Sequence, residues 1–268
     1  MTWALRPRSE FGQLSAIRAG SGPRVILLHG VGLRAEAWAC QIDALSMRYE
    51  VIAPDMPGHG ESVGLPDTPT LRDFTNRVAT AMDRPAVVIG HSMGAMIAAD
   101  LAIRYAKNVQ GLVAMNAIYR RTSEAAAAVQ ARAAGLDGIS RGDPTGPLER
   151  WFGGLPSAAS SACRTWLETV DPQGYRNAYA VFAREDGPPD AGLGGLHCPA
   201  LFFTGEREPN STPQMSRAMA ALAPKGRAVV LPGAAHMMPM THPDQVNEAL
   251  SQFLSDLQSA GDPVPERS

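Results

Sequence analysis

Apolar runs alternate with amphipathic segments along most of the chain. Six of these runs are short and continuous, which is the pattern of strands covered on both faces of a sheet. They occupy residues 25–28, 51–53, 87–89, 112–115, 200–203 and 228–231. Helical spacing of apolar positions fills several of the intervals between them. The pattern therefore predicts an α/β fold, in which a mainly parallel sheet carries helices on both faces.

Local signals mark where some of these elements begin. Thr70 and Asp73 have the spacing of a capping box ahead of an amphipathic helix, and Pro243 is placed to begin another helix. Ahead of the first buried run, residues 13–18 are predicted to form an antiparallel edge strand. That strand leads into the turn-prone segment 20–23.

The alternation breaks between Ala117 and Pro199, where no strand pattern occurs. An alanine-rich helix is predicted at residues 123–134, and helical pieces interrupted by glycine and proline follow it. We predict that this insertion folds as a helical cap over the carboxyl edge of the sheet. The predicted parts are a core domain of residues 1–118 and 198–258, a cap of residues 119–197 and a flexible tail of residues 259–268.

Aromatic side chains are concentrated in the predicted cap. They are Trp151, Phe152, Trp166, Tyr175, Tyr179 and Phe182. Of these, Trp151, Tyr179 and Phe182 are our candidates for substrate contacts. The alternative is that the aromatic residues only pack the cap against the core. Arg120 and Arg121, at the start of the cap, either clamp a substrate carboxylate or keep a hinge solvated.

Composition and charge exclude several classes of function. The chain has 268 residues, enough for one large core, and a formal net charge of −2 with both signs scattered along it. No basic surface for nucleic acid or for an anionic membrane is indicated, so a small molecule is the expected partner. Cys40, Cys163 and Cys198 are far apart and match no metal-ligand spacing, which favours a reducing cytoplasm over a disulfide framework. Neither a signal peptide nor a membrane-spanning run is predicted.

The most informative motif is Gly90-His91-Ser92-Met93-Gly94, which follows an apolar strand and opens a helical segment. A serine on such a sharp turn projects its hydroxyl clear of the sheet, and small flanking residues are needed where the chain turns so tightly. Ser92 is therefore the predicted nucleophile.

A serine nucleophile needs a base, and histidine titrates near neutrality. Of the six histidines, His236 lies just beyond the last predicted strand and so at the same sheet edge as Ser92. It is the predicted base. His197 and His242 are expected to be structural or solvated, and His91 to be a packing residue because it points away from the nucleophile.

The base in turn needs a carboxylate that orients it. The loop after residues 200–203 supplies Glu206 and Glu208, and we predict that Glu208 is the orienting acid. Glu206 remains the alternative. The preceding strand ends at Asn116, whose amide cannot supply a negative charge.

The segment His29-Gly30-Val31-Gly32 follows the first long strand and permits close approach of its backbone. The backbone N–H groups of Val31 and Met93 are the predicted oxyanion-hole donors. The other interpretation of this segment is a turn that only ends the strand.

Taken together, five segments in this order resemble the landmarks of the α/β-hydrolase family. They are 29–32, 54–62, 90–94, 205–208 and 233–236. The resemblance implies an eight-stranded, mostly parallel sheet with a helical cap between strands six and seven, and it assigns Ser92, Glu208 and His236 to a catalytic triad. Most capped members have aspartate where this chain has Glu208. The loop containing Asp55 and His59 is expected to support the nucleophile turn.

A serine nucleophile without a cofactor or metal indicates hydrolysis of a small ester or lactone through an acyl-enzyme. Segments 149–152 and 171–175 are loosely similar to stretches of 3-oxoadipate enol-lactonases and related small hydrolases. Three alternatives stay open at this point. They are carbon-carbon bond hydrolysis of ring-cleavage products, a perhydrolase side activity, and a ligand-binding homologue that does not turn over.

Overall fold

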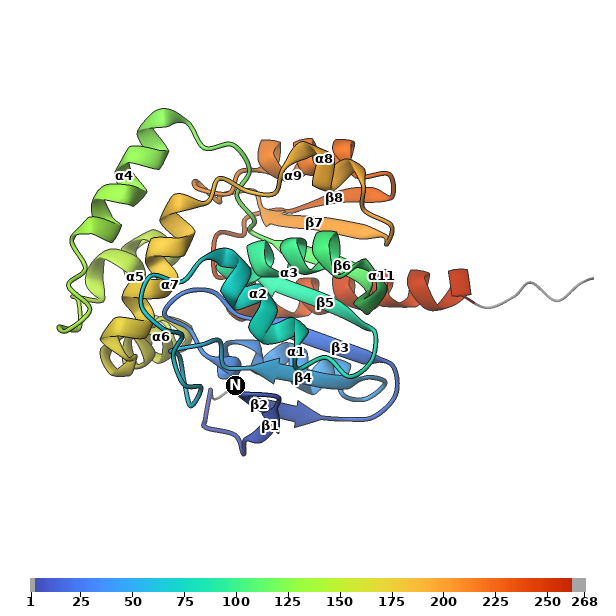
Figure 1. Ribbon diagram of the computed structural model, residues 1–268, viewed down its shortest axis with the longest axis horizontal. Coiled ribbons are helices and arrows are strands. Elements are labelled where there is room, and N and C mark those ends of the chain that lie inside the picture. The colour runs from blue at the N-terminus through green and yellow to red at the C-terminus, as the bar shows by residue number, and fades with distance from the viewer. Residues whose placement is uncertain (1–2, 262–268) are drawn as a thin grey trace, which may run out of the picture.

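The computed structural model describes residues 3–261, and an eight-stranded sheet runs through its centre in the order β1-β2-β4-β3-β5-β6-β7-β8 (Figure 1). The strands are β1 (Ser9–Phe11), β2 (Leu14–Ala19), β3 (Arg24–Leu28), β4 (Glu50–Pro54), β5 (Ala86–His91), β6 (Val109–Met115), β7 (Ala200–Gly205) and β8 (Gly226–Leu231). Only the pairings of β2 with β1 and β4 are antiparallel. The predicted fold class is confirmed. The strand predicted at residues 13–18 is present as β2 and is antiparallel, but it lies second in the sheet, because β1 pairs with it and forms the edge.

Helices cover both faces of the sheet. Their bounds are η1 (Ala35–Trp38), α1 (Ala39–Leu45), α2 (Leu71–Ala79), α3 (Met93–Arg104), η2 (Ala106–Asn108), α9 (Pro213–Leu222), α10 (Met238–Thr241) and α11 (Pro243–Gly261). Apolar residues of α2, α3 and α9 are buried against one face, and those of α1 and α11 against the other. These two layers account for the continuous apolar strands, which have no solvated side.

The predicted start signals lie at the helix ends. Asp73 accepts hydrogen bonds from the Thr70 backbone N–H at 2.8 Å and from its hydroxyl at 2.7 Å, at the start of α2. α11 begins at Pro243 but continues to Gly261, so the first three residues of the predicted tail 259–268 are helical. The Ser259 hydroxyl donates to the Ser255 carbonyl within this last turn. Residues 262–268 lie outside the described part of the chain.

Between β6 and β7 the chain forms helices and no strand. They are α4 (Ser123–Ala134), α5 (Thr145–Phe152), α6 (Ala158–Thr169), α7 (Pro172–Arg184) and α8 (Asp190–Gly194). Figure 1 shows α4, α5, α6 and α7 gathered at one end of the sheet. In contrast, α8 lies beside α9, and Leu193 and Leu196 are buried in the core. We therefore propose that the cap ends with α7 rather than at residue 197.

Part of the aromatic set joins the cap to the core. Trp166 and Leu167 on α6 are buried in one cluster with Leu33 and Met240, and Phe152 packs against that cluster. For Trp166 and Phe152 the packing interpretation therefore describes the structure.

Two further findings concern disulfide bonds and membrane-spanning helices, neither of which the composition predicted. Cys163 and Cys198 are buried and form no disulfide. None of the helices within residues 3–261 combines the length and apolar character that crossing a membrane requires. The cytoplasmic location stays a prediction.

Candidate active site

Ser92 occupies a strained turn between β5 and α3. Its backbone angles are φ 57° and ψ −121°, which a residue with a side chain adopts only where its surroundings enforce it. Side chains are excluded on both sides of the turn. A Cβ on Gly90 would lie 2.0 Å from the Gly94 carbonyl oxygen, and one on Gly94 would lie 2.1 Å from the Leu28 carbonyl oxygen. The motif therefore forms the nucleophile turn predicted from the sequence.

His236 and Glu208 meet at the same edge of the sheet, because each follows the carboxyl end of a parallel strand. The His236 Nδ1–H donates to Glu208 Oε2 at 2.8 Å. This hydrogen bond fixes the tautomer, so that Nε2 is the nitrogen left to accept a proton. The sequence predicted this pair.

Glu208 is held as a buried carboxylate by donors on both oxygens. Oε1 accepts from the backbone N–H groups of Asn210 at 2.8 Å and Ser211 at 3.3 Å, and Oε2 also accepts from the Asn116 side-chain amide at 3.1 Å. Burial alone would raise the pKa of Glu208, but the interaction with His236 and these hydrogen bonds outweigh it and lower the pKa to about 2. Glu208 is therefore ionised at any pH near neutrality.

Glu206, the alternative acid, is engaged elsewhere. Its Oε2 accepts from the Gly233 backbone N–H at 2.9 Å, which ties it to the turn after β8. It is exposed, whereas Glu208 is 2% exposed. Of the two carboxylates, only Glu208 is hydrogen-bonded to His236.

Ser92 and His236 line one cavity of about 170 Å³, which we call the reaction cavity. Among the described residues, no hydrogen bond joins the Ser92 hydroxyl to the imidazole. Such contacts are often long in unliganded enzymes and shorten when substrate binds. The structure therefore brings the predicted nucleophile and base to the same space.

Val31 also lines the reaction cavity. Its loop approaches the nucleophile closely, since a Cβ on Gly30 would lie 3.0 Å from Ser92 Cβ. The backbone N–H groups of Val31 and Met93 donate to no acceptor in the part of the chain that is described. Both predicted oxyanion donors are thus available to a ligand.

Two buried histidines hold the loop that carries Val31. Nε2 of His59 accepts from the Gly32 backbone N–H at 3.0 Å, and Nε2 of His29 accepts from the Met56 backbone N–H at 2.9 Å. The loop containing His59 was expected to support the nucleophile turn, and its hydrogen bond is to the segment that carries Val31. Asp55 is not an acid partner of His59, because its carboxylate binds Arg8 and backbone N–H groups.

Sequence reasoning missed two residues around the base. His91, interpreted as packing only, donates from Nε2 to the His236 carbonyl oxygen at 2.8 Å. Asn116, dismissed as an acid, donates to Glu208. The available signal was position, since each lies at the carboxyl end of a strand next to the triad.

The buried imidazoles make stability pH-dependent. Burial, the larger cause, and a neighbouring histidine lower the pKa values of His29 and His91 to about 3, against about 6.5 in an unfolded chain. Between these values the unfolded chain binds more protons, so we expect the free energy of unfolding to fall as the pH falls below 6.5, by about 1 kcal/mol per pH unit for each imidazole. Chemical denaturation at pH 7, 6 and 5 measures this slope.

Burial lowers the pKa of His59 as well, so the variant His91→Asn is expected to reduce that slope by about a third, because one of three buried imidazoles no longer titrates. The matched control is His197→Asn, at an exposed position. An unchanged slope in His91→Asn would contradict the neutral, buried state of His91.

The three predicted contact residues Trp151, Tyr179 and Phe182 all line the reaction cavity. The ring of Trp151 stacks over His236 at a centroid distance of 6.2 Å. Trp151 also packs against the cluster that contains Trp166, and Trp166 itself lies outside the cavity. Substrate contact by the three lining residues stays a prediction.

Three arginines line the same cavity, namely Arg121, Arg132 and Arg150. Arg121 lies over the Phe182 ring and donates to the Phe182 carbonyl at 3.0 Å. Burial lowers its pKa to about 10, so it stays charged near neutrality. Arg120, the other predicted clamp, is instead exposed and paired with Asp190. Arg132 and Arg150 were not predicted.

These arginines lack acidic partners. Among the described residues, none of the three guanidinium groups has a carboxylate within 4.0 Å. In contrast, buried Arg8 has two, Glu36 and Asp55. The reaction cavity therefore carries uncompensated positive charge, which suits an anionic ligand.

No group of three His, Cys, Asp or Glu side chains within residues 3–261 is arranged to hold a metal ion. The chemistry available to the site is that of the serine, imidazole and carboxylate described above, together with backbone donors.

Comparison with known proteins identifies the family to which the chain is similar. Residues 25–249 match the model of the alpha/beta hydrolase family. The chain is 38% identical over 243 residues to an (E)-2-((N-methylformamido)methylene)succinate hydrolase of Acinetobacter baylyi, and the match covers 88% of this chain and 91% of that protein.

Solved structures with similar coordinates include hydrolases of two kinds. A thermophilic esterase from Thermogutta terrifontis with malate bound has a TM-score of 0.81 and 26% identity, covering 95% of this chain and 99% of that one. An enol-lactonase from Burkholderia xenovorans has a TM-score of 0.81 and 23% identity, covering 93% of this chain and 100% of that one, which is a likeness of fold.

Proposed function

Because the chain belongs to the alpha/beta hydrolase family and is an enzyme of that family, we propose that it is a cofactor-independent serine hydrolase of a small, carboxylate-bearing ester or lactone. The observation that carries the proposal is the Glu208–His236 hydrogen bond at the wall of the cavity that Ser92 also lines. An intact nucleophile, base and acid in one place favours turnover over simple ligand binding.

The proposed reaction has two halves. Ser92 Oγ attacks the substrate carbonyl while His236 Nε2 takes its proton, and the oxyanion accepts hydrogen bonds from the Val31 and Met93 backbone N–H groups. His236 then returns the proton to the leaving alkoxide as the carbon–oxygen bond breaks, leaving an ester on Ser92. Water, deprotonated by the same imidazole, releases the acid and restores the serine.

Glu208 contributes by stabilising the imidazolium that forms in each half. Its low pKa keeps it ionised while His236 carries the proton, so the proton stays on the imidazole.

We propose a carboxylate on the substrate because three arginines line the reaction cavity. A guanidinium binds a carboxylate through two parallel hydrogen bonds, and Arg121, Arg132 and Arg150 have no acidic partner in the cavity. Two relatives support the class of ligand, since one is named for a succinate derivative and another was solved with malate.

A second candidate substrate is an N-acyl compound with the same carboxylates. The observation that favours it is the 38% identity to a relative whose named substrate carries a formamido group. The same residues would serve, with His236 protonating a leaving nitrogen instead of an oxygen.

The variant Arg150→Gln tests whether the enzyme recognises a carboxylate on its substrate. Arg150 makes no hydrogen bond or ion pair with another described residue, so its removal breaks no polar contact within that part of the chain. We expect the KM for monomethyl succinate to rise by about 10- to 100-fold, with kcat little changed, because a charge-assisted contact to the bound substrate is lost. The KM for dimethyl succinate, which lacks the carboxylate, should change by less than about two-fold. Acid release in a pH-stat measures both.

The matched control is Arg120→Gln, which removes an exposed arginine outside the cavity. It should behave as wild type with both esters. Equal activity of the wild-type enzyme on the charged and uncharged esters would contradict a carboxylate-bearing substrate.

A further inference from the structure

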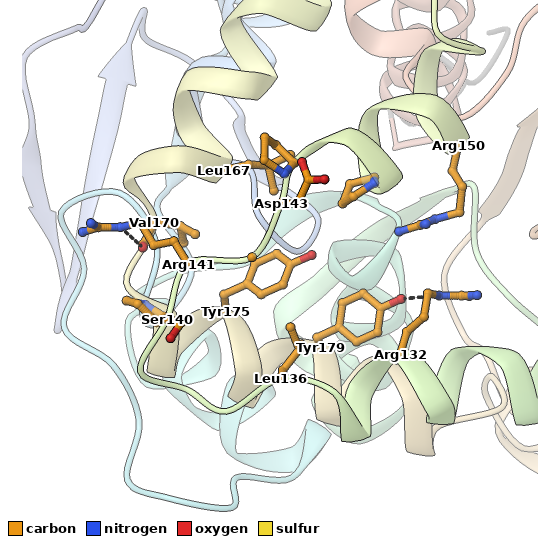
Figure 2. Close-up of a pocket in the computed structure, with 14 residues that line it drawn as sticks. Arg132, Leu136, Ser140, Arg141, Asp143, Arg150, Leu167, Val170, Tyr175 and Tyr179 are labelled. Carbon is orange, nitrogen blue, oxygen red and sulfur yellow. Dashed lines mark hydrogen bonds between the residues drawn. The ribbon is translucent and has the colours of Figure 1, made fainter.

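A second cavity adjoins the reaction cavity inside the cap, and we call it the cap chamber (Figure 2). Its volume is about 240 Å³, and neither Ser92 nor His236 lines it. The two cavities share Arg132, Pro147, Arg150, Tyr175 and Tyr179 as walls. These shared side chains form the partition between the two cavities, so a ligand would have to pass the two tyrosines to reach from the nucleophile into the cap chamber.

The cap chamber is positively charged. Three arginines line it, Arg132, Arg141 and Arg150, against one carboxylate, Asp143. Asp143 accepts from the Thr145 backbone N–H at 2.9 Å and forms no ion pair with the arginines within 4.0 Å among the described residues. Arg132 and Arg141 are exposed to solvent and Arg150 is half-buried, and no carboxylate of the described residues lies within 4.0 Å of their guanidinium groups, so their charge is accessible to an anion.

The internal contacts of these arginines are to neutral groups. Arg132 Nε donates to the Tyr179 hydroxyl at 3.0 Å, and Arg141 Nε donates to the Val170 carbonyl at 3.3 Å. Figure 2 shows Arg132 and Arg150 on one side of the tyrosine rings and Arg141 on the opposite side. Arg141 lines the cap chamber but not the reaction cavity. Substituting Arg141 therefore changes the cap chamber without changing a wall of the reaction cavity.

The remaining walls suit a short carbon chain that ends in an acceptor. Leu136, Leu167 and Val170 supply apolar surface. The Tyr175 hydroxyl, which hydrogen-bonds to no other described residue, is a free donor between the cavities. Burial raises the pKa of Tyr175 to about 12, so the hydroxyl keeps its proton.

We infer that the cap chamber is an anion subsite, which binds a second carboxylate of the substrate remote from the scissile carbonyl. This inference rests on the proposed function, because it extends the same substrate from the reaction cavity into the cap. The substrate class is then a derivative of a dicarboxylic acid, with one carboxylate near Arg121, Arg132 and Arg150 and the other near Arg141, which lines the cap chamber and not the reaction cavity.

Binding to the full-length Ser92→Ala protein tests the inference without turnover. The probes are dicarboxylates from succinate to pimelate and the monocarboxylates of equal length, measured by calorimetry. We expect one chain length at which the dicarboxylate binds about ten-fold or more tightly than its monocarboxylate partner. Arg141→Gln in this background should remove that preference and leave the Kd of the monocarboxylate within two-fold.

Two further variants sharpen the result. Arg141→Lys should keep part of the preference, since the charge remains while the bidentate contact is lost. Arg164→Gln, which removes an α6 arginine that lines neither cavity, should bind as the Ser92→Ala protein does. Circular dichroism confirms that each variant is folded.

Three outcomes would overturn the subsite: equal Kd values for dicarboxylates and monocarboxylates, no effect of Arg141→Gln, or tighter binding of uncharged esters, which would make the chamber an acyl-chain pocket. Failure of the proposed function would be seen in a different experiment, the hydrolysis assay. In that case wild type and Ser92→Ala would hydrolyse monomethyl succinate equally, whatever the binding series shows.

Discussion

Replacing Ser92 by alanine is expected to lower kcat/KM for a hydrolysed ester by roughly 10⁵-fold or more. The hydroxyl is the only proposed attacking group, and residual rate would come from the oxyanion donors and from binding. Alanine keeps a Cβ at the same strained backbone angles, φ 57° and ψ −121°, so the turn is neither relieved nor further strained. Steady-state kinetics and a thermal unfolding curve measure the two effects, and the melting temperature should stay within a few degrees.

The matched control is Ser216→Ala. Ser216 is a fully buried serine on α9 whose hydroxyl has no hydrogen-bond partner within the described part of the chain, and it lies outside the reaction cavity. This variant should keep wild-type activity. Sustained turnover by Ser92→Ala, at a rate close to wild type, would show that another group attacks the substrate and would remove the proposed mechanism.

Glu208→Gln is expected to lower kcat by about 10³- to 10⁴-fold. Four donors converge on the two oxygens of Glu208, but a glutamine has a single acceptor oxygen. If that oxygen serves the Asn210 and Ser211 backbone N–H groups, the glutamine amide faces His236 and selects the wrong tautomer. If it serves His236, two buried N–H groups lose their acceptor. In both cases the charge that stabilises the imidazolium is gone.

Glu206→Gln is the matched control, two residues away in the same loop. Its exposed side chain keeps an oxygen that can accept from the Gly233 backbone N–H, so activity should stay within about three-fold of wild type. If the two variants ranked in the reverse order, Glu206 would have to be the acid that orients His236.

Most of the fold follows from pattern alone. Strands buried on both faces must be continuously apolar, and parallel strands bring their carboxyl ends to one edge. For that reason strand pattern and direction are enough to assign Ser92, Glu208 and His236, which are far apart in the chain, to the same edge. The tail boundary at residue 259 was less accurate, because Ser259 is compatible with a last helical turn that ends at Gly261.

The residues that support His236 and Glu208 could not be predicted from strand pattern and direction. His91 was expected to point away from the nucleophile and only to pack. Its Nε2 instead donates a hydrogen bond to the His236 carbonyl, in a loop 145 residues further along the chain. Likewise, Asn116 was judged by its own charge, whereas its role comes from the 3.1 Å contact with Glu208. Neither contact has a periodicity or a motif.

What the sequence by itself determined is therefore the sheet, the helical insertion between β6 and β7 and the placing of Ser92, Glu208 and His236 at one sheet edge, because these depend on local pattern and on strand direction. Only the tertiary structure decided that Glu208 rather than Glu206 is hydrogen-bonded to His236, and that Arg132, Arg141 and Arg150 line adjoining cavities without an acidic partner among residues 3–261. The physical reason is that both are matters of which side chains meet across the fold. Side-chain direction and helix packing in the cap set those meetings, and residue spacing along the chain does not encode them.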